Sequence, residues 1–228
     1  MSNIHNYEHP YVTVDGIVLK PSYGDSNGSG RAKMKWNILL VKRTASPQNG
    51  SWSLPGGFMD IDKELDKTLF EKLFHKAGLV EYYMEQLKTF DAIGRDERGR
   101  VLTVAYLVLL HKYDDALPEN AKWFTIEEEN LVSDDEKLFF NDLAFDHAEI
   151  LREGLKRIQG KIWYSDIPQY LLAPEFTIKE AQDLFELVEN KKTGSFRRQM
   201  GDRIVSVKNK QVDTKGRPAQ LYRWNRNR

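Results

Sequence analysis

Residues 54–79, LPGGFMDIDKELDKTLFEKLFHKAGL, join a glycine-containing turn to an amphipathic helix. Apolar residues recur at helical spacing from Leu65 onward, and Gly78 stands at the position that usually ends a helix. The segment therefore predicts a turn at residues 55–57 and a helix that ends at Gly78. The apolar stripe of this helix is formed by Leu65, Leu69 and Leu73, supported by Phe70, Phe74 and Ala77.

Segments rich in β-branched or apolar residues flank this helix and predict strands. The predicted strands are residues 11–20, 37–43, 87–93, 101–110 and 122–126. Residues 139–158 have apolar side chains at helical spacing and predict one long helix, with His147 as a hydrogen-bonded packing residue. Residues 160–174 contain two prolines and predict a connector or a short helix.

The composition is that of a folded protein with one or two domains. The chain has 228 residues, 40% of them hydrophobic, and its 34 basic and 34 acidic residues cancel. It has no cysteine, which excludes disulfides, a thiol nucleophile, a thiolate zinc site and an iron–sulfur cluster. The amino end lacks a signal-peptide pattern, and the longest apolar run, residues 104–110, is too short to span a membrane. We expect a cytoplasmic protein without a membrane partner.

The charge is distributed unevenly along the chain. Residues 191–228 contain 12 basic residues and only two acids, Asp202 and Asp213, whereas residues 1–176 carry a net charge of −7. Such polarity suggests two domains, one of which binds a polyanion, because each cation placed on a phosphate releases condensed counterions. The alternative is a basic tail that only keeps the protein soluble.

The basic region has the order helix, turn, helix, hairpin. Thr177 and Glu180 have the spacing of a capping box, which predicts a helix that continues to about Asn190. A turn at residues 191–194 precedes a second helix, which Ser195 is expected to cap and in which Phe196, Met200 and Ile204 point inward. Two strands, residues 205–208 and 219–224, are joined by a basic tip at residues 209–218. This order is that of a winged helix-turn-helix domain, which binds double-stranded DNA.

Polar and basic side chains of this domain are the candidate DNA-binding residues. Those of the turn and the second helix are expected at base edges or nearby phosphates, and those of the hairpin along the phosphate backbone. The candidates are Lys191, Lys192, Ser195, Arg197, Arg198, Gln199, Arg203, Lys208, Lys210, Lys215 and Arg217.

The segment from Leu54 to Leu79 resembles the Nudix box, in which glutamates hold the divalent metal ions of a hydrolase. Aligned on Gly57 and Gly78, which are 21 positions apart, the first glutamate position is Lys63, and the later arginine and glutamate positions fall on residues 71–76, Glu-Lys-Leu-Phe-His-Lys. Lys72, His75 and Lys76 would repel a divalent cation. The resemblance therefore implies a Nudix domain that is not an enzyme and holds no metal and no cofactor. A metal site displaced to Asp60 and Glu64 is the catalytic alternative.

The resemblance extends over residues 11–224. Residues 94–110 are similar to the arginine-bearing turn and following strand of ADP-ribose-type Nudix domains, and residues 143–151 and 196–198 to segments of the Nudix-related transcriptional regulators. This family implies an α+β fold: a Nudix-like α/β/α sandwich, expected at residues 1–158, and a connector with a C-terminal winged helix-turn-helix domain, expected at residues 159–228. It also implies a homodimer on a palindromic operator and an effector bound in the Nudix domain.

Two small molecules are candidates for the effector. The best-known members of the family respond to ADP-ribose and control NAD metabolism, and this chain is similar to a branch that responds to L-arabinose and controls carbohydrate use. A repressor released from DNA by L-arabinose is therefore expected, with ADP-ribose as the rival because Arg95, Arg98 and Arg100 could bind its diphosphate. The expected ligand-binding residues are Tyr11, Arg43, Gln48, Trp52, Asp60 and Arg95. A scaffold for protein partners remains a third possibility, in which neutralising Arg197 and Arg198 would be tolerated.

Overall fold

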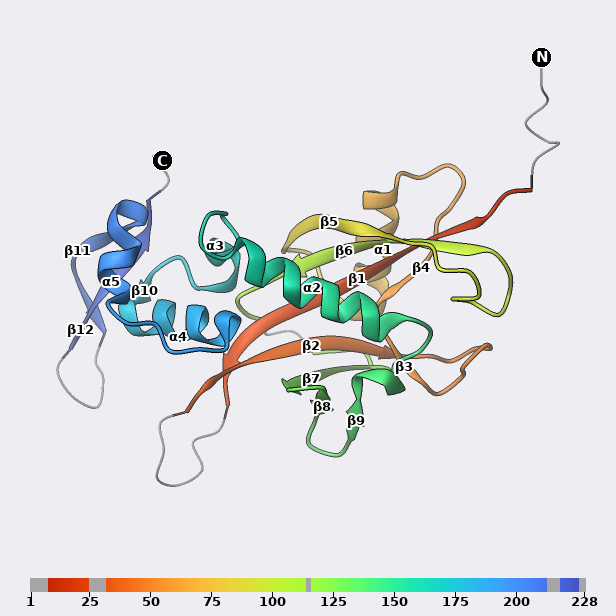
Figure 1. The fold of residues 1–228 in the computed structure, drawn as a ribbon, viewed down its shortest axis with the longest axis horizontal. Helices are drawn as coiled ribbons and strands as arrows, with labels where there is room; N and C mark the ends of the chain where they lie inside the picture. The colour runs from red at the N-terminus through yellow and green to blue at the C-terminus, as the bar shows by residue number, and fades with distance from the viewer. Residues whose placement is uncertain (1–7, 25–31, 114–115, 213–217, 226–228) are drawn as a thin grey trace, which may run out of the picture. The chain divides into compact units, whose positions relative to one another are not determined.

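The computed structural model describes residues 8–24, 32–113, 116–212 and 218–225, and the chain divides into two compact units (Figure 1). Unit 1 consists of Met1–Leu19, Asn37–Val108 and Asp114–Gly154, and unit 2 of Lys20–Trp36, Leu109–Tyr113 and Leu155–Arg228. The expected division into residues 1–158 and 159–228, which assigns the two short inner segments to the first domain, stays a prediction.

The larger sheet has nine strands within the described residues. The strand order is β5-β6-β1-β2-β7-β8-β9, with β3 paired to β2 and β4 paired to β1. All five predicted strands are present with shifted ends, and the additional strands are only two or three residues long, too short to produce a periodic pattern. The strands are β1 (Tyr11–Tyr23), β2 (Met34–Lys42), β3 (Trp52–Ser53), β4 (Gly56–Phe58), β5 (Tyr83–Phe90), β6 (Val101–Leu109), β7 (Ala121–Glu127), β8 (Asn130–Val132) and β9 (Lys137–Phe139). Helices α1 (Leu65–Ala77) and α2 (His147–Lys161) pack on them.

The two helices cover opposite faces of β1. A Cβ atom added to Gly16 would lie 3.3 Å from Leu69 of α1, whereas one added to Gly154 of α2 would lie 2.6 Å from Ile17. Because neighbouring residues of a strand point to opposite faces, α1 and α2 lie on opposite sides of the sheet (Figure 1). The arrangement confirms the expected α/β/α sandwich.

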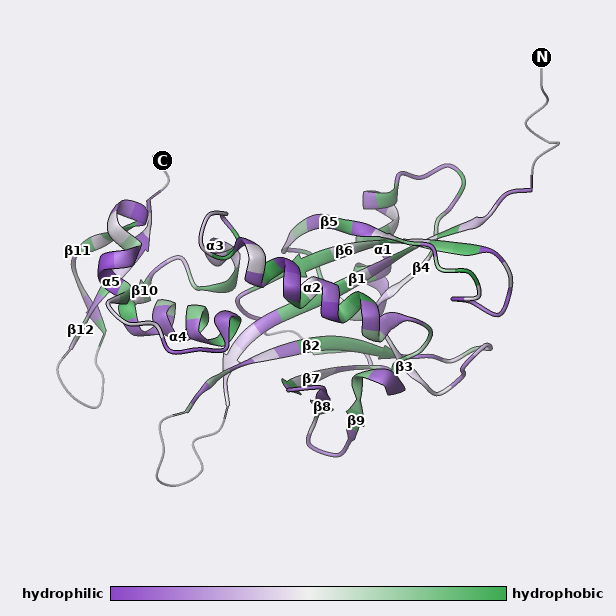
Figure 2. Ribbon diagram, in the orientation of Figure 1, coloured by the Kyte–Doolittle hydropathy of each residue, from purple (hydrophilic) through white to green (hydrophobic). Residues whose placement is uncertain are grey.

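Strand β6 is hydrophobic along most of its length, and β1 and β2 each contain a hydrophobic stretch (Figure 2). Buried residues follow one another without alternation in the middle of β1, β2 and β6. Such runs are expected when helices cover both faces of a sheet. The core of unit 1 therefore consists of these strands and the inner sides of α1 and α2.

Helix α1 confirms the prediction for residues 65–78 in its boundaries. Gly78 has the left-handed conformation (φ 68°), its N–H donates to the carbonyl oxygen of Phe74 at 2.9 Å, and the N–H of Leu79 donates to that of Leu73 at 3.4 Å. Leu69 and Leu73 are buried as expected. Phe70 and Phe74 are exposed, however, because each follows a buried residue by one position and so lies about 100° around the helix.

The predicted helix over residues 139–158 is wrong in its first half. Phe139 ends β9, a short 3-10 helix η2 (Phe140–Asp142) follows, and α2 begins only at His147. The Asp142 carboxylate accepts a hydrogen bond from the N–H of Phe139 at 2.7 Å and holds this turn. Phe140 and Leu143 are buried nonetheless, so side chains from a 3-10 helix, the turn after it and an α-helix imitate one helical stripe.

Unit 2 contains the predicted winged-helix order. Thr177 begins α4 with a complete capping box: its hydroxyl accepts from the N–H of Glu180 at 3.1 Å, and the Glu180 carboxylate accepts from the N–H of Thr177 at 2.7 Å. The small sheet has the order β10-β12-β11. The elements are α3 (Pro168–Leu171), β10 (Phe176–Thr177), α4 (Ile178–Glu189), α5 (Phe196–Met200), η3 (Gly201–Arg203), β11 (Ile204–Val212) and β12 (Ala219–Trp224).

The second helix of this domain is shorter than the sequence suggests. Ser195 has a left-handed backbone (φ 54°) and no capping hydrogen bond from its side chain, so its expected role as a cap is wrong. Phe196, Met200 and Ile204 are buried as predicted, although Ile204 already belongs to β11. Within the described part of the chain, no helix has both the length and the apolar character needed to cross a membrane.

Candidate functional site

Unit 1 contains a polar pocket of about 210 Å³ beside α1. Its walls come from β1, β3 and β4, the turn after β5 and the start of α2. The lining includes four cationic side chains and two carboxylates, an excess of positive charge. The lining residues are Thr13, Asp15, Arg43, Ser53, Leu54, Gly56, Gly57, Phe58, Lys76, Arg95, Asp96, Arg98, Phe145 and His147.

Two arginines in the pocket are each held by an aspartate. Arg95 donates to Asp146 from Nε at 2.8 Å and from Nη2 at 2.6 Å, and its side chain is only 4% exposed. Arg98 donates to Asp96 from Nε at 2.9 Å and from Nη2 at 2.6 Å, and the hydrogen bond with Arg98 lowers the pKa of the Asp96 carboxyl. Such two-point pairs fix both the position and the orientation of a guanidinium.

Two aromatic rings stack against the pocket's guanidinium groups. The Arg43 guanidinium lies 4.7 Å from the ring centre of Phe145, and that of Arg98 lies 4.8 Å from the ring centre of Phe58. Arg43 also donates from Nε to the carbonyl oxygen of Pro47 at 2.9 Å. Burial lowers the pKa of Arg43, and the positive charge of Arg98 acts in the same direction. Added negative charge would relieve this crowding of cations.

A buried polar group forms another wall of the pocket. His147 is buried as predicted, and its Nδ1 accepts from the N–H of Leu54 at 2.9 Å. Its Nε2 lies 3.8 Å from an Asp15 carboxylate oxygen, and the other Asp15 oxygen accepts from the Thr103 hydroxyl at 2.7 Å. Burial lowers the pKa of His147, so the neutral imidazole with its proton on Nε2 fits these contacts. This group fixes Leu54 directly before the glycine turn.

The residues at the Nudix metal positions do not fit a divalent cation. Lys63 stands at the first glutamate position and forms ion pairs with Glu71 at 2.6 Å and Asp60 at 3.0 Å. Lys76 lies in the pocket, whereas His75 is exposed and outside it, contrary to the expectation that both occupy one metal-facing side. Among the described residues, no cluster of three or more His, Asp or Glu could hold a metal ion.

The pocket contains two of the six expected ligand-binding residues, Arg43 and Arg95. Tyr11 is 63% exposed, with its ring edge-on to Phe58 at 6.0 Å. The Gln48 side chain accepts a hydrogen bond from the N–H of Phe145 at 2.9 Å, so it holds a lining residue without lining the pocket.

Trp52 and Asp60 also lie outside the pocket lining. The ring of Trp52 packs edge-on against Phe124 in the core, and Asp60 is paired with Lys63. The sequence interpretation missed Phe58 and Phe145 as lining residues and considered Lys76 only as a residue that excludes metal. Phe58 could have been predicted as a lining residue because it directly follows the paired glycines of the turn. No feature of the sequence predicts the left-handed backbone of Phe145 (φ 56°).

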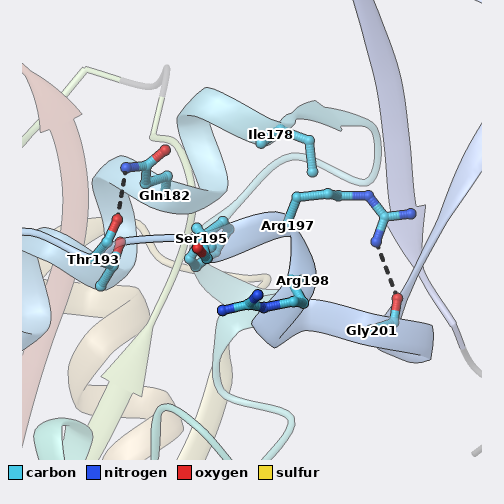
Figure 3. Close-up of a pocket in the computed structure, with 8 residues that line it drawn as sticks. Ile178, Gln182, Thr193, Ser195, Arg197, Arg198 and Gly201 are labelled. Atoms are coloured by element: carbon cyan, nitrogen blue, oxygen red, sulfur yellow. Dashed lines mark hydrogen bonds between the residues drawn. The ribbon is translucent and has the colours of Figure 1, made fainter.

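Unit 2 has an open hollow on the turn and helix α5 (Figure 3). Arg197 and Arg198 leave the helix in different directions, and Arg197 donates to the carbonyl oxygen of Gly201 at 3.1 Å (Figure 3). The Arg197 guanidinium lies 5.4 Å from the ring centre of Tyr222. The hollow is lined by Ile178, Gln182, Thr193, Ser195, Phe196, Arg197, Arg198 and Gly201.

Most other expected DNA-binding residues are exposed where the structure describes them. Lys191, Lys192, Gln199 and Lys208 have exposed side chains, although Lys191 forms an ion pair with Glu189 at 2.7 Å. The expectation that Arg203 projects outward is wrong: its guanidinium donates to the carbonyl oxygens of Trp163 and Ser165. Lys210 belongs to β11, but its side chain lies outside the described residues, as do Lys215 and Arg217.

Both parts of the chain match known protein families. Residues 26–142 match the NUDIX domain, and residues 168–224 match the NrtR DNA-binding winged helix domain. These matches agree with the sandwich around the pocket and with the order of elements in unit 2.

Relatives share this combination over nearly the full chain. The chain is 32% identical to the ADPR responsive transcriptional repressor NtrR of Acinetobacter baylyi, over 96% of this chain and 84% of the relative. The structure of Shewanella oneidensis NrtR complexed with a 27mer DNA is similar with a TM-score of 0.70 and 29% identity, over 94% of this chain and 93% of that one. The NUDIX domain of the same S. oneidensis protein, complexed with ADP ribose, has a TM-score of 0.51 and 29% identity over 69% of this chain and 94% of that one.

Proposed function

The chain belongs to the NrtR family, in which a Nudix domain precedes a DNA-binding winged helix, and on this premise we propose that it is a transcriptional repressor whose Nudix pocket binds ADP-ribose. In this proposal, ADP-ribose binding weakens the binding of the winged helix to operator DNA. The relatives support the proposal because the A. baylyi repressor is named as ADPR responsive and the S. oneidensis domain is a complex with ADP ribose.

The observation that carries the proposal is the charge of the Nudix pocket. Four cations and two carboxylates line it, with the rings of Phe58 and Phe145 beside them. A diphosphate compensates an excess of positive charge, and aromatic rings provide surfaces on which a base can stack. A neutral pentose could hydrogen-bond to the polar groups of the pocket, but it would leave the excess positive charge uncompensated because it brings no negative charge.

L-Arabinose is not favoured as the effector. The sequence-based preference for it rests on resemblance to a branch of the family, and none of the relatives described above is named for a sugar. The rival stated from the sequence, ADP-ribose, agrees with the names of the relatives and with Arg98 in the pocket. With ADP-ribose as the effector, we propose that the protein controls NAD metabolism and not carbohydrate use, as the resemblance to the ADP-ribose-responsive regulators implies.

The proposed protein binds ADP-ribose without hydrolysing it. Nudix hydrolysis needs divalent metal ions to neutralise the diphosphate and to position the attacking water. Lys63 and Lys76 stand where the pattern has glutamates. The carboxylates of Asp60 and Glu71 form ion pairs with Lys63 and are therefore not free to bind a metal ion. Turnover of ADP-ribose in the presence of Mg²⁺ would contradict this part of the proposal.

On the DNA side, we propose a homodimer that binds a palindromic operator. Arg197, Arg198 and Gln199 are exposed on the short helix α5 and are assigned to base edges or flanking phosphates. Lys208 of β11 is assigned to the phosphate backbone. A dimer would place two copies of α5 about one helical turn of DNA apart.

Titration calorimetry of the full-length protein tests the choice of effector. ADP-ribose is expected to bind and to reduce operator binding, and L-arabinose is expected to do neither. If L-arabinose binds and releases the operator and ADP-ribose does neither, L-arabinose is the effector and the proposal of ADP-ribose is wrong.

A further inference from the structure

Lys76 occupies the position at which a Nudix hydrolase would use a metal ligand. It lies in the last turn of α1, and its ammonium donates to the carbonyl oxygen of Gly56 at 2.6 Å. This hydrogen bond directs the cation toward the glycine turn of the pocket, and Lys76 is one of the lining residues. The side chain therefore has a defined position before any ligand binds.

No acidic partner neutralises Lys76. Arg95 and Arg98 have aspartate partners in the same pocket, but no carboxylate among the described residues is within ion-pair distance of the Lys76 ammonium. Burial lowers the pKa of Lys76, and the positive charges of Lys72 and Arg43 add to this effect, whereas Asp15 opposes it. A half-buried cation without an acidic partner is a position at which a bound anion gains most.

The neighbouring residues add to this positive field. The Lys72 side chain runs along the same turn, since a Cβ atom added to Gly57 would lie 3.2 Å from its Cε. Arg43 lies across the pocket against Phe145. The surroundings of the glycine turn thus combine several cations where a hydrolase has carboxylates that bind metal.

We propose that Lys76 replaces the metal ion of a Nudix hydrolase: its ammonium binds the diphosphate of ADP-ribose directly, so that the ligand binds without a divalent cation. This inference rests on the proposed function, because it assigns a binding role within the same pocket. On this inference, the replacement of the last Nudix glutamate by Lys76 does more than abolish catalysis, because the lysine itself binds the ligand.

The metal dependence of binding tests the inference on the unmodified protein. ADP-ribose is titrated into full-length protein in buffer with Mg²⁺ and in buffer with EDTA. Equal affinity in both buffers is expected. Binding that disappears with EDTA would overturn the inference while leaving ADP-ribose as the effector. If ADP-ribose binds in neither buffer, the proposed effector is wrong and the inference falls with it.

A matched pair of variants tests the residue itself. Lys76→Met removes the charge inside the pocket, and Lys67→Met removes a charge from the exposed side of the same helix, where Lys67 is 72% exposed and paired with Glu64. Loss of one charged hydrogen bond predicts roughly 10- to 100-fold weaker ADP-ribose binding for Lys76→Met. Lys67→Met should bind as the unmodified protein does.

Thermal unfolding without ligand separates binding from a purely structural role. If Lys76 only holds the Gly56 carbonyl, Lys76→Met lowers the melting temperature but leaves the affinity of the folded protein unchanged, and that result would overturn the inference. A reduced dependence of ADP-ribose affinity on salt in Lys76→Met supports it, because one charge fewer then acts on the diphosphate.

Discussion

The cations of the Nudix pocket and those of the winged helix are held in opposite ways. In the pocket, Arg95 and Arg98 each donate two hydrogen bonds to one aspartate. On α5, Arg197 and Arg198 have no carboxylate within ion-pair distance among the described residues, and both are exposed. Arginines held by carboxylates can select a small ligand of one shape, whereas exposed arginines without a carboxylate partner can pair with DNA phosphates and release counterions.

The two groups of arginines are expected to contribute to different properties, the pocket arginines to folding stability and the α5 arginines to DNA affinity. An arginine that neutralises a buried aspartate contributes to the folded state, so its removal leaves an unpaired charge. An exposed arginine contributes little to folding, and its removal is felt only when DNA is bound.

The largest effect is expected for Arg95→Met. The substitution leaves Asp146 without its partner in a site where the arginine side chain is only 4% exposed, which is expected to destabilise unit 1 by about 3–5 kcal/mol. Urea unfolding measures the change, with Arg100→Met on the exposed loop as control. Equal stability of the two variants would show that the pocket does not depend on fixed ion pairs.

The second effect is expected for Arg197→Ala on DNA binding. Loss of a base-edge contact should weaken operator binding by about 1–3 kcal/mol and relax specificity, without a change in unfolding. Lys192→Ala should weaken operator and random DNA alike, because a phosphate contact carries no sequence information. Fluorescence anisotropy with both DNAs measures this, and the same loss on both DNAs for both variants would refute the assigned roles.

The third effect is a pH dependence of unfolding. Burial lowers the folded-state pKa of His147 below its ordinary value of 6.5, so the unfolded state takes up a proton first as the pH falls. His147 therefore contributes stability above about pH 6.5, and this contribution is lost on acidification by at most about 1.4 kcal/mol per pH unit. The free energy of unfolding, measured with denaturant, should depend less steeply on pH in His147→Gln than in the unmodified protein. The range to measure is pH 5 to 7, which brackets the ordinary histidine pKa of 6.5. An unchanged slope would assign the acid sensitivity to other groups.

The smallest effect is expected for Thr177→Ala. Loss of the capping hydroxyl should destabilise α4 and the winged helix by about 1 kcal/mol. The affinity for ADP-ribose should not change, since Thr177 belongs to unit 2 and the pocket to unit 1. Thermal unfolding and calorimetry on the same samples measure both properties, and a parallel loss of ligand affinity would show that the pocket depends on the winged helix.

The sequence predicts local structure best where one short motif sets it. Gly78 and Thr177 define helix ends through backbone geometry and capping, and both act as expected. Helical spacing alone misleads at Phe140 and Leu143, because burial from a turn gives the same pattern as burial from a helix. Short turns with left-handed residues, such as Phe145, therefore escape prediction.

The sequence predicts the motif at the candidate site, but it does not predict which residues line the pocket. The spacing of Gly57 and Gly78 correctly places the glycine turn and Lys76 together. Contacts between distant residues decide the rest: Gln48 holds the backbone of Phe145, which is 97 positions away. Such pairings depend on the complete sheet, so no local pattern distinguishes the lining residue Phe145 from the core residue Trp52.

Operator binding with and without ADP-ribose tests the central claim most directly. The operator is first selected from random DNA by the full-length protein, and binding is then followed by fluorescence anisotropy while ADP-ribose or L-arabinose is added. A coupling of about 1–3 kcal/mol predicts roughly 5- to 150-fold weaker operator binding with ADP-ribose and no change with L-arabinose. Operator affinity that is unchanged at saturating ADP-ribose, as measured by calorimetry on the same protein, would contradict the account.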